Sequence, residues 1–160
     1  MLKNIIKISQ EVFKHMGGLN FDEKDFQLAF GYELAKYKID YLREISLEVY
    51  YKKIPVKLGA PDFFLNALNP PVIVELKLSS SIQNSHRQQL KMYLVSIQRN
   101  PKSVLSQVKH GIIINFLKED SNIVNQVTKK AKRNKIEIEY YQLDKKENLK
   151  LLSCHNTQVK

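Results

Sequence analysis

Three charged residues near the middle of the chain are spaced so that their side chains could act together. Glu75 and Lys77 end an apolar run that begins at Val72, and Asp62 follows Pro61 thirteen residues before Glu75. Side chains two apart on a strand point to the same face, so Glu75 and Lys77 lie side by side if this run is a strand. Two carboxylates can hold a hard divalent cation, and an ammonium beside them can stabilise a phosphodiester under attack by water. The pattern therefore predicts metal ligands at Asp62 and Glu75 and a catalytic role for Lys77. The alternative is a surface ion pair between Glu75 and Lys77, because so short a motif also arises by chance.

A second group of polar residues lies on the helix predicted after this strand, over residues 82–99. His86, Gln89 and Tyr93 are three and four residues apart, so they share one helix face. The amide of Gln89 and the phenol of Tyr93 can hold a phosphate, a sugar or a water, and we predict that both serve the site. His86 is predicted to contact nucleic acid through a base or a phosphate. The alternative is a polar face that meets solvent while the tyrosine packs.

Two acids on the helix predicted from Asn20 to about Lys38 are further candidates. Glu23 is a candidate catalytic acid, but Asn20-x-x-Glu23 also fits a capping box, in which Glu23 only bonds the Asn20 backbone. Glu33 falls near the apolar stripe of Phe26 and Phe30, so we expect it to be partly buried. A buried acid beside a metal site would be functional, whereas an acid at the edge of the stripe would reach solvent.

The charge balance favours a polyanionic partner. Lys+Arg outnumber Asp+Glu by 26 to 16, for a formal net charge of +10. We predict DNA, with RNA as the alternative, and a backbone-tracking basic surface. Its predicted members are Arg87 and Lys91 on the helix of residues 82–99, and the cluster Lys129, Lys130, Lys132 and Arg133. The alternative is a lysine-rich solvent surface, with the clustered lysines complementing a helix dipole.

Cysteine content and hydropathy bear on the compartment. Cys154 is the single cysteine, so the chain forms no internal disulfide and no cysteine zinc site, which fits a reducing compartment. The first fifteen residues, interrupted by Lys3 and Lys7, do not resemble a signal peptide, and no apolar run approaches the ~20 residues that span a bilayer. We therefore expect a cytoplasmic or other intracellular protein without membrane contact.

The periodicity of apolar residues predicts an α/β domain. Helical spacing predicts a first helix ending at Gly17-Gly18, and alternation predicts strands over 43–51, 56–65 and 72–78. After the helix at 82–99 we expect a buried strand at 110–117, a helix at 122–135 and a strand at 136–143, while 148–153 adds one more strand and the last six residues fray. The order α-α-β-β-β-α-β-α-β predicts a central mixed β-sheet flanked by helices.

Five short motifs carry a resemblance to a known family. In chain order they are Glu23-x-x-Phe26, Pro61-Asp62, Val72-Ile73-Val74-Glu75-Leu76-Lys77, His86-x-x-Gln89-x-x-x-Tyr93-Leu94 and Gly111-Ile112-Ile113-Ile114-Asn115-Phe116. With this set, the chain resembles the GxxExxY group of the PD-(D/E)XK nuclease superfamily, which is related to RecB-like and Holliday-junction-resolvase-like nucleases. It departs from the group in Phe26, which replaces a tyrosine, in two extra residues before Glu23, and in a longer segment between Asp62 and Glu75.

The resemblance implies a restriction-endonuclease-like fold and a function. By resemblance, Asp62 and Glu75 bind Mg²⁺ or Mn²⁺, Lys77 is catalytic, Glu23 is an auxiliary acid, and Gln89 with Tyr93 forms the helix motif of the RecB-like branch. We expect one domain over residues 1–160, with a nuclease core of about 17–117 and a C-terminal helix and strand addition at 118–160 that could bind DNA, form a dimer interface or cover a sheet edge.

Three functions remain open at this stage. The leading hypothesis is a divalent-metal-dependent nuclease that hydrolyses phosphodiester bonds in DNA, with repair, recombination and defence all open as its process. The alternative is a catalytically inactive nuclease-fold protein that binds nucleic acid, which the intact set of two acids and a lysine argues against. The third is an interaction module for an acidic protein partner. A homodimer is compatible with all three.

Overall fold

A six-stranded mixed β-sheet forms the centre of the protein. The computed structural model describes residues 1–17, 20–100, 105, 107–118 and 134–158. The strand order is β1-β4-β5-β6-β7-β8, with β5 and β6 parallel and the other neighbours antiparallel. The strands are β1 (Leu42–Arg43), β4 (Phe63–Leu65), β5 (Val72–Ser79), β6 (His110–Leu117), β7 (Asn134–Leu143) and β8 (Leu149–Gln158). The predicted fold class is confirmed.

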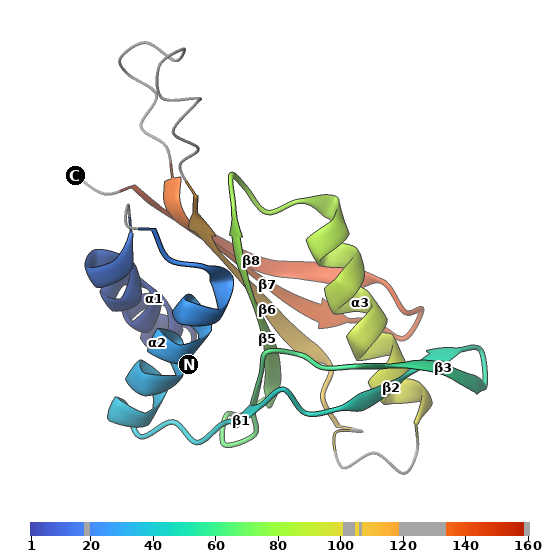
Figure 1. Cartoon of the computed structure of the whole chain (residues 1–160). Coiled ribbons are helices and arrows are strands. Elements are labelled where there is room, and N and C mark those ends of the chain that lie inside the picture. The colour runs from blue at the N-terminus through green and yellow to red at the C-terminus, as the bar shows by residue number, and fades with distance from the viewer. Residues whose placement is uncertain (18–19, 101–104, 106, 119–133, 159–160) are drawn as a thin grey trace.

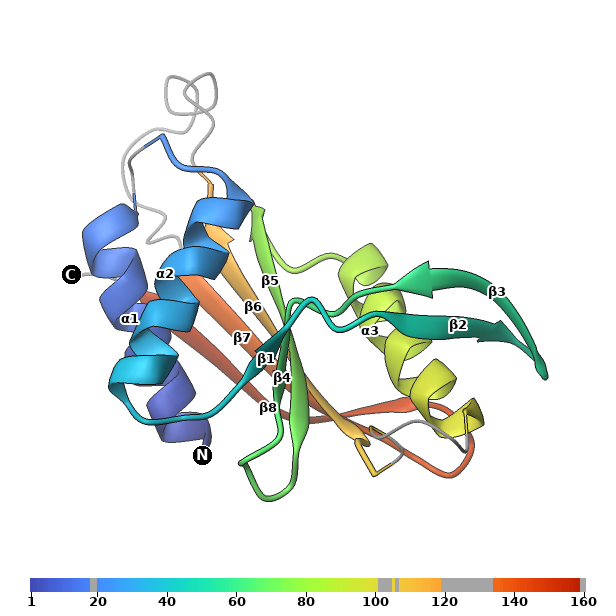
Figure 2. The same ribbon diagram turned by 60° about the horizontal axis from the view of Figure 1, so that its bottom comes forward.

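Helices cover both faces of this sheet (Figures 1 and 2). On one face lie α1 (Leu2–Met16) and α2 (Glu23–Lys36). On the other lies α3 (Asn84–Arg99), against which a separate antiparallel hairpin packs. Its strands are β2 (Leu47–Tyr51) and β3 (Ile54–Gly59). Within the described ranges, no helix is both long and apolar enough to cross a membrane.

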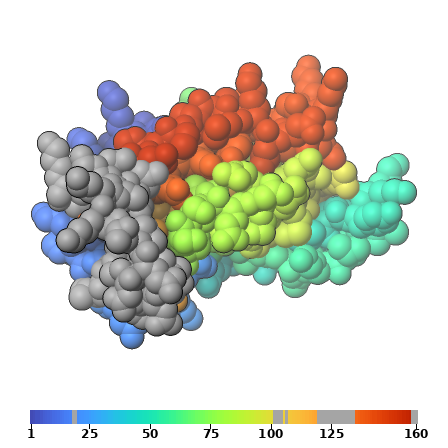
Figure 3. Space-filling model, turned by 90° about the horizontal axis from the view of Figure 1, so that it is seen from above, coloured from blue at the N-terminus to red at the C-terminus, as the bar shows by residue number. Residues whose placement is uncertain are grey.

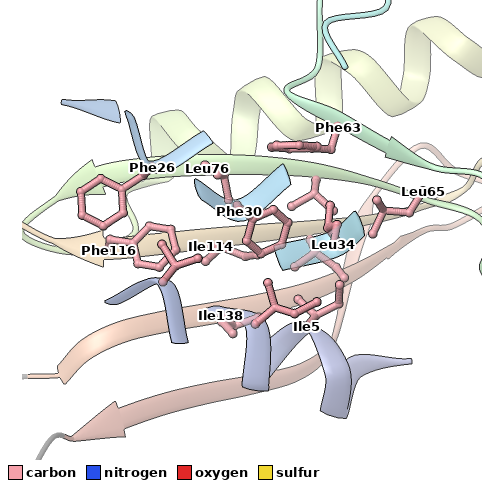
Figure 4. Packing of buried hydrophobic residues seen from close by; sticks show 14 of the residues in the cluster. Ile5, Phe26, Phe30, Leu34, Phe63, Leu65, Leu76, Ile114, Phe116 and Ile138 are labelled. Carbon is pink, nitrogen blue, oxygen red and sulfur yellow. The ribbon is translucent and has the colours of Figure 1, made fainter. Parts of the chain in front are cut away.

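The alternation of side chains along β5 divides the core into two halves. Val72, Val74 and Leu76 pack with the α1–α2 layer, where the aromatic side chains of α2 meet the sheet (Figure 4). Ile73 packs in the other cluster, beneath α3 and β2. Because side chains two apart share a face, Glu75 continues the row of Ile73 and lies on the α3 side. The core thus fixes the direction in which the charged end of β5 points.

Several predicted boundaries were wrong. The strand predicted over 56–65 is two strands, because the chain leaves the hairpin at Gly59 and joins the central sheet only at Phe63. The strand predicted over 43–51 is interrupted after Arg43, since Glu44 adopts a positive φ of 48° that a strand does not accommodate. In α2 the N-cap is Asp22, which forms a reciprocal capping box with Asp25, so the alternative of an Asn20–Glu23 box is wrong.

The C-terminal part of the chain is more regular than predicted. The strand predicted at 148–153 is confirmed and is longer, because the residues expected to fray pair with β7 as far as Gln158. Residues 134 and 135, predicted as the end of a helix, begin β7. The rest of that predicted helix lies outside the described residues. Since β7 and β8 extend the same sheet as the strands of the predicted site, they belong to the central sheet, while the division of the chain into core and addition remains a prediction.

Candidate functional site

The two predicted metal ligands meet where β4 and β5 part. The ladder of these strands begins with Phe63 opposite Val74, so Asp62 and Glu75 are the first positions beyond it. The Leu76 N–H, which has no strand partner on that side, donates to Asp62 Oδ2 at 2.7 Å. The Asp62 N–H in turn donates to Glu75 Oε1 at 3.2 Å. These two bonds hold both carboxylates in place at the same end of the ladder.

Lys77 joins this pair from the same strand face. Its Nζ lies 3.3 Å from Glu75 Oε2, as the alternation of the strand predicts. The Glu75 side chain is 1% exposed and the Lys77 side chain 12%, so the contact is withdrawn from water. The alternative of a surface ion pair is therefore wrong. A buried charge pair with a further carboxylate beside it is costly for folding and indicates a function.

Burial sets the protonation of the two acids. It raises the pKa of Asp62 to about 6. It also raises the pKa of Glu75 to about 8, and the negative charge of Asp62 adds to that rise. Burial alone would lower the pKa of Lys77, but the charges of Glu75, Glu23 and Asp62 outweigh it and raise that pKa instead. Lys77 is therefore an ammonium at neutral pH, and the two acids compete for a proton unless a cation neutralises them.

Helix α2 adds two side chains to the site. Gln27 is buried, and its Nε2 donates to Asp62 Oδ1 at 2.9 Å. One helical turn earlier, Glu23 is partly exposed, and its charge acts on Asp62, Lys77 and His86. Because the capping box is made by other residues, Glu23 is available to the site. The structure thus brings Glu23 together with the predicted ligands and adds Gln27, which the sequence did not single out.

Helix α3 lies on the side of the site opposite α2. Gln89 Nε2 donates to the Tyr93 hydroxyl at 3.3 Å. Burial raises the pKa of Tyr93, and the charge of Glu75 acts in the same direction. The tyrosine ring lies against Gly59, where a Cβ would stand 2.7 Å from Tyr93 Cε1, so a glycine is needed there.

His86, at the start of α3, takes part in a capping box: its Nδ1 accepts the Gln83 N–H at 3.1 Å. Burial together with the charge of Lys77 lowers the pKa of His86. All three side chains of the predicted helix face therefore lie on the side of the site.

Comparison with known families decides the relationship of this chain. A family model described as the PD-(D/E)XK nuclease superfamily matches residues 1–127, a span that contains all the residues of the site described above. The chain belongs to the PD-(D/E)XK nuclease superfamily. Neither a curated protein nor a solved structure matches it. Membership indicates a nuclease with a nucleic-acid substrate, and enzymes of this superfamily generally use divalent metals.

The acid pair suits such a metal by its donor chemistry. Each carboxylate oxygen of Asp62 and Glu75 accepts one hydrogen bond within the protein, which leaves further lone pairs for a cation. Hard divalent cations take carboxylate oxygens and keep several waters, so two carboxylates suffice. Within the described part of the chain no cluster of three or more histidine, cysteine or acidic side chains is placed to hold a metal. The donor set fits a PD-(D/E)XK metal site of two acids.

Glu33, unlike the predicted residues above, lies apart from this candidate site. Glu33 is buried as expected, but its ion-pair partner is Lys36, at 3.5 Å, and it lies ten residues along α2 from Glu23, a rise of about 15 Å. Lys91 is partly exposed on α3. Lys129, Lys130, Lys132 and Arg133 lie outside the described residues. The roles predicted for all six remain predictions.

Arg87 has a structural partner that the sequence did not reveal. Its guanidinium binds Glu139 of β7 through two hydrogen bonds, of 2.8 and 2.7 Å, and also donates to the Tyr141 hydroxyl. Such a fork between guanidinium and carboxylate is the strong form of the ion pair. It ties α3 to the sheet, and the predicted contact of Arg87 with nucleic acid remains untested.

A buried asparagine orders the connection between β5 and α3. Asn115 of β6 accepts from the Ser79 N–H at 3.0 Å and donates to the Ser79 carbonyl at 3.1 Å and to Glu137 at 3.1 Å. Glu137 also accepts the Ile82 N–H at 2.7 Å. The segment that leads from Lys77 to α3 is thereby fixed on both sides. In the sequence, Asn115 stood out only as part of a family motif, and no local sequence pattern predicts this role.

Proposed function

We propose that this chain is an active nuclease that hydrolyses phosphodiester bonds in DNA with Mg²⁺ or Mn²⁺ as cofactor. The observation that carries the proposal is the meeting of Asp62 and Glu75 at the end of the β4–β5 ladder, with the Lys77 ammonium 3.3 Å from Glu75. All three groups are largely withdrawn from water, and a divalent cation would offset the cost of holding two acids side by side there. Superfamily membership supports the same chemistry.

Asp62 and Glu75 would hold the cation, which polarises a phosphate and lowers the pKa of a bound water. Gln27 and the Leu76 N–H each bind one oxygen of Asp62, so this carboxylate keeps its direction when substrate arrives. Lys77 stays protonated and offers a compact positive charge to the negative charge that develops on the phosphate. Glu23 and the Gln89–Tyr93 pair stand on opposite sides of this centre and can position water or phosphate oxygens.

A catalytically inactive binding protein on the same fold is the alternative. Such a protein gains nothing from carboxylates that face phosphates, because like charges repel. Retention of both acids and the lysine in one buried group therefore favours the enzyme. Assignment to the GxxExxY group and to repair, recombination or defence rests on the motif resemblance and forms part of this proposal.

The test is a cleavage assay with purified protein. Labelled single-stranded, duplex and branched DNA, and RNA of the same sequence, are incubated with Mg²⁺, Mn²⁺ or EDTA. We expect metal-dependent cleavage of DNA that falls by about 10³-fold or more in Asp62→Asn and Lys77→Met proteins. Lys7→Met serves as the matched control, because Lys7 is an exposed lysine of α1, on the other face of the sheet from α3.

Two outcomes would contradict the proposal. Cleavage that persists in the Asp62→Asn and Lys77→Met proteins would come from a contaminant or another site. Tight DNA binding with no cleavage in any metal, and no effect of EDTA on affinity, would identify the inactive binding protein instead. Preferential cleavage of RNA would retain the nuclease and correct its substrate.

A further inference from the structure

The β2–β3 hairpin, residues 47–59, forms an arm that stands apart from the central sheet. It is a separate two-stranded sheet, and it projects past α3 at one end of the molecule (Figures 2 and 3). Its base is anchored, because Leu47 and Val49 pack beneath α3 and the Tyr50 N–H donates to Ser96 Oγ at 3.2 Å. From Tyr51 to Leu58 every residue is exposed. The arm therefore presents a fixed base and a free outer end.

The outer end of the arm is positively charged without compensation. Residues 51–61 contain Lys52, Lys53 and Lys57 and no acid. Among the described residues, no carboxylate forms an ion pair with any of these three lysines. An uncompensated cluster of this kind attracts a polyanion.

The turn at the tip contains lysines although its backbone conformation disfavours them. Lys52 and Lys53 form the two-residue connection between the strands, and Lys52 has a φ of 54°. Glycine or asparagine is favoured at such a position, because most side chains with a Cβ are strained at positive φ. A lysine held there at a cost of about 1 kcal/mol indicates that the charge is used.

Apolar side chains stand beside these lysines. Tyr51 and Ile54 are cross-strand partners, so their side chains are neighbours, and they are 62% and 64% exposed. The Lys52 ammonium lies 5.5 Å from the centre of the Tyr51 ring. Leu58, 70% exposed, adds apolar surface nearer the base. Aromatic and apolar side chains next to lysines match unpaired nucleotides, whose phosphates meet the ammonium groups while the base faces stack. A duplex offers its phosphates but keeps its base faces inside the stack.

The arm is joined directly to the catalytic centre. Only Ala60 and Pro61 lie between the end of β3 at Gly59 and Asp62, and Gly59 lies against the Tyr93 ring. Resting on the proposed nuclease function, we propose that the tip Tyr51–Ile54 binds a single-stranded stretch of the substrate, with Lys52 and Lys53 on its phosphates and Tyr51 against a base. The site lies eight residues along the chain from Ile54, so a strand held at the tip would run along β3 to reach it.

Fluorescence anisotropy in EDTA measures this binding without cleavage. The probes are a labelled single-stranded oligonucleotide and its duplex. The test variant replaces Lys52 by Asn and Lys53 by Gly, which removes two charges and supplies the turn residues that favour the hairpin. Its control replaces Lys3 and Lys7 by Gln, the same loss of charge on exposed positions of α1. A third protein carries Tyr51→Ala.

We expect the Asn-Gly protein to bind the single strand about tenfold more weakly, with the slope of log affinity against log salt reduced by about 1.4, and the α1 control to bind like the wild type. Tyr51→Ala should weaken single-strand binding about fivefold or more and duplex binding little.

Equal losses in the arm and α1 proteins, or unchanged single-strand binding by both arm proteins, would overturn the proposal even if the wild type cleaves DNA. Arm-dependent binding in a protein that never cleaves would instead refute the nuclease function alone. If the arm variants change only the molar mass in solution, the arm binds a second copy of this chain and the proposal is wrong.

Discussion

Glu75→Gln should make the metal-free protein more stable, although the substitution removes a proposed metal ligand. Glu75 is almost fully buried, and its pKa is raised from 4.5 to about 8 by burial and by the charge of Asp62. The folded state therefore binds a proton that the unfolded state has released at neutral pH. The stability that this carboxyl contributes is present in full below pH 4.5 and is lost as pH rises from 4.5 to about 8.

The size of the effect follows from the same two values. At pH 7 this carboxyl is mostly protonated in the folded state and ionised in the unfolded state. Folding must therefore protonate it, which costs about 3 kcal/mol because pH 7 lies above its unfolded pKa and each pH unit is worth about 1.36 kcal/mol. Glutamine has the same shape and no charge to suppress, but its amide has one acceptor oxygen for two donors, the Asp62 N–H and the Lys77 ammonium, which takes back about 1–2 kcal/mol. We expect a net gain of about 1–2 kcal/mol at pH 7, or about 2–8 °C in melting temperature for a chain of this size.

Thermal and urea unfolding in EDTA at pH 5, 7 and 8.5 measures this gain. The advantage of Glu75→Gln should grow with pH, and adding Mg²⁺ should stabilise the wild type but not the variant. The matched control is Glu139→Gln, the same substitution at another buried glutamate of the sheet. Its pKa is lowered: burial would raise it, but the hydrogen bonds from Arg87 and Tyr141 outweigh that burial. Glu139→Gln should therefore destabilise the protein at pH 7. A Glu75→Gln protein that is less stable than the wild type at pH 8.5, or a difference that does not change with pH, would refute the reasoning.

Two further predictions concern residues that support the site. Gln27→Leu removes the hydrogen bond to Asp62 Oδ1, and we expect the rate of cleavage to fall about 10- to 100-fold with little change in KM, measured on the preferred DNA substrate. An unchanged kcat would show that Gln27 does not position Asp62. Asn115→Leu removes one of the two hydrogen bonds to Glu137 and leaves the Ser79 N–H without its partner, so the free energy of unfolding should fall by about 2–3 kcal/mol in urea titrations. A smaller loss than 0.5 kcal/mol, on the order of a surface substitution, would contradict this.

The centre of the site could be predicted because its signal is local. Glu75 and Lys77 lie two apart on one strand, so alternation alone places them together, and the apolar residues before them reveal the strand. Asp62 needed one further step, because it lies on a different segment and reaches Glu75 only through the pairing of β4 with β5. The motif supplied that step by resemblance, since periodicity does not reveal strand pairing.

Contacts between distant segments could not be predicted. Gln27 meets Asp62 across 35 residues, and Arg87 meets Glu139 across 52, and neither spacing has a local pattern. Arg87 looked like an exposed base on a helix, and only the sheet brings a carboxylate to it. The split of the strand predicted over 56–65 had a signal in Gly59 and Pro61, since glycine and proline interrupt strands, but the apolar residues on both sides hid it.

The opposite charges of the arm and the site suggest how the two would divide the work. The arm is positive in every state, whereas Asp62, Glu75 and Glu23 surround a single ammonium, so the metal-free centre is negative even when the two buried acids share a proton. A phosphodiester brought to within about 4 Å of one excess negative charge loses about 4 kcal/mol at an effective dielectric constant of ~20. The arm can therefore hold a strand without a metal, but a phosphate can enter the centre only when a divalent cation reverses its charge. Binding on the arm and entry into the site are then separate events, and only the second depends on the metal.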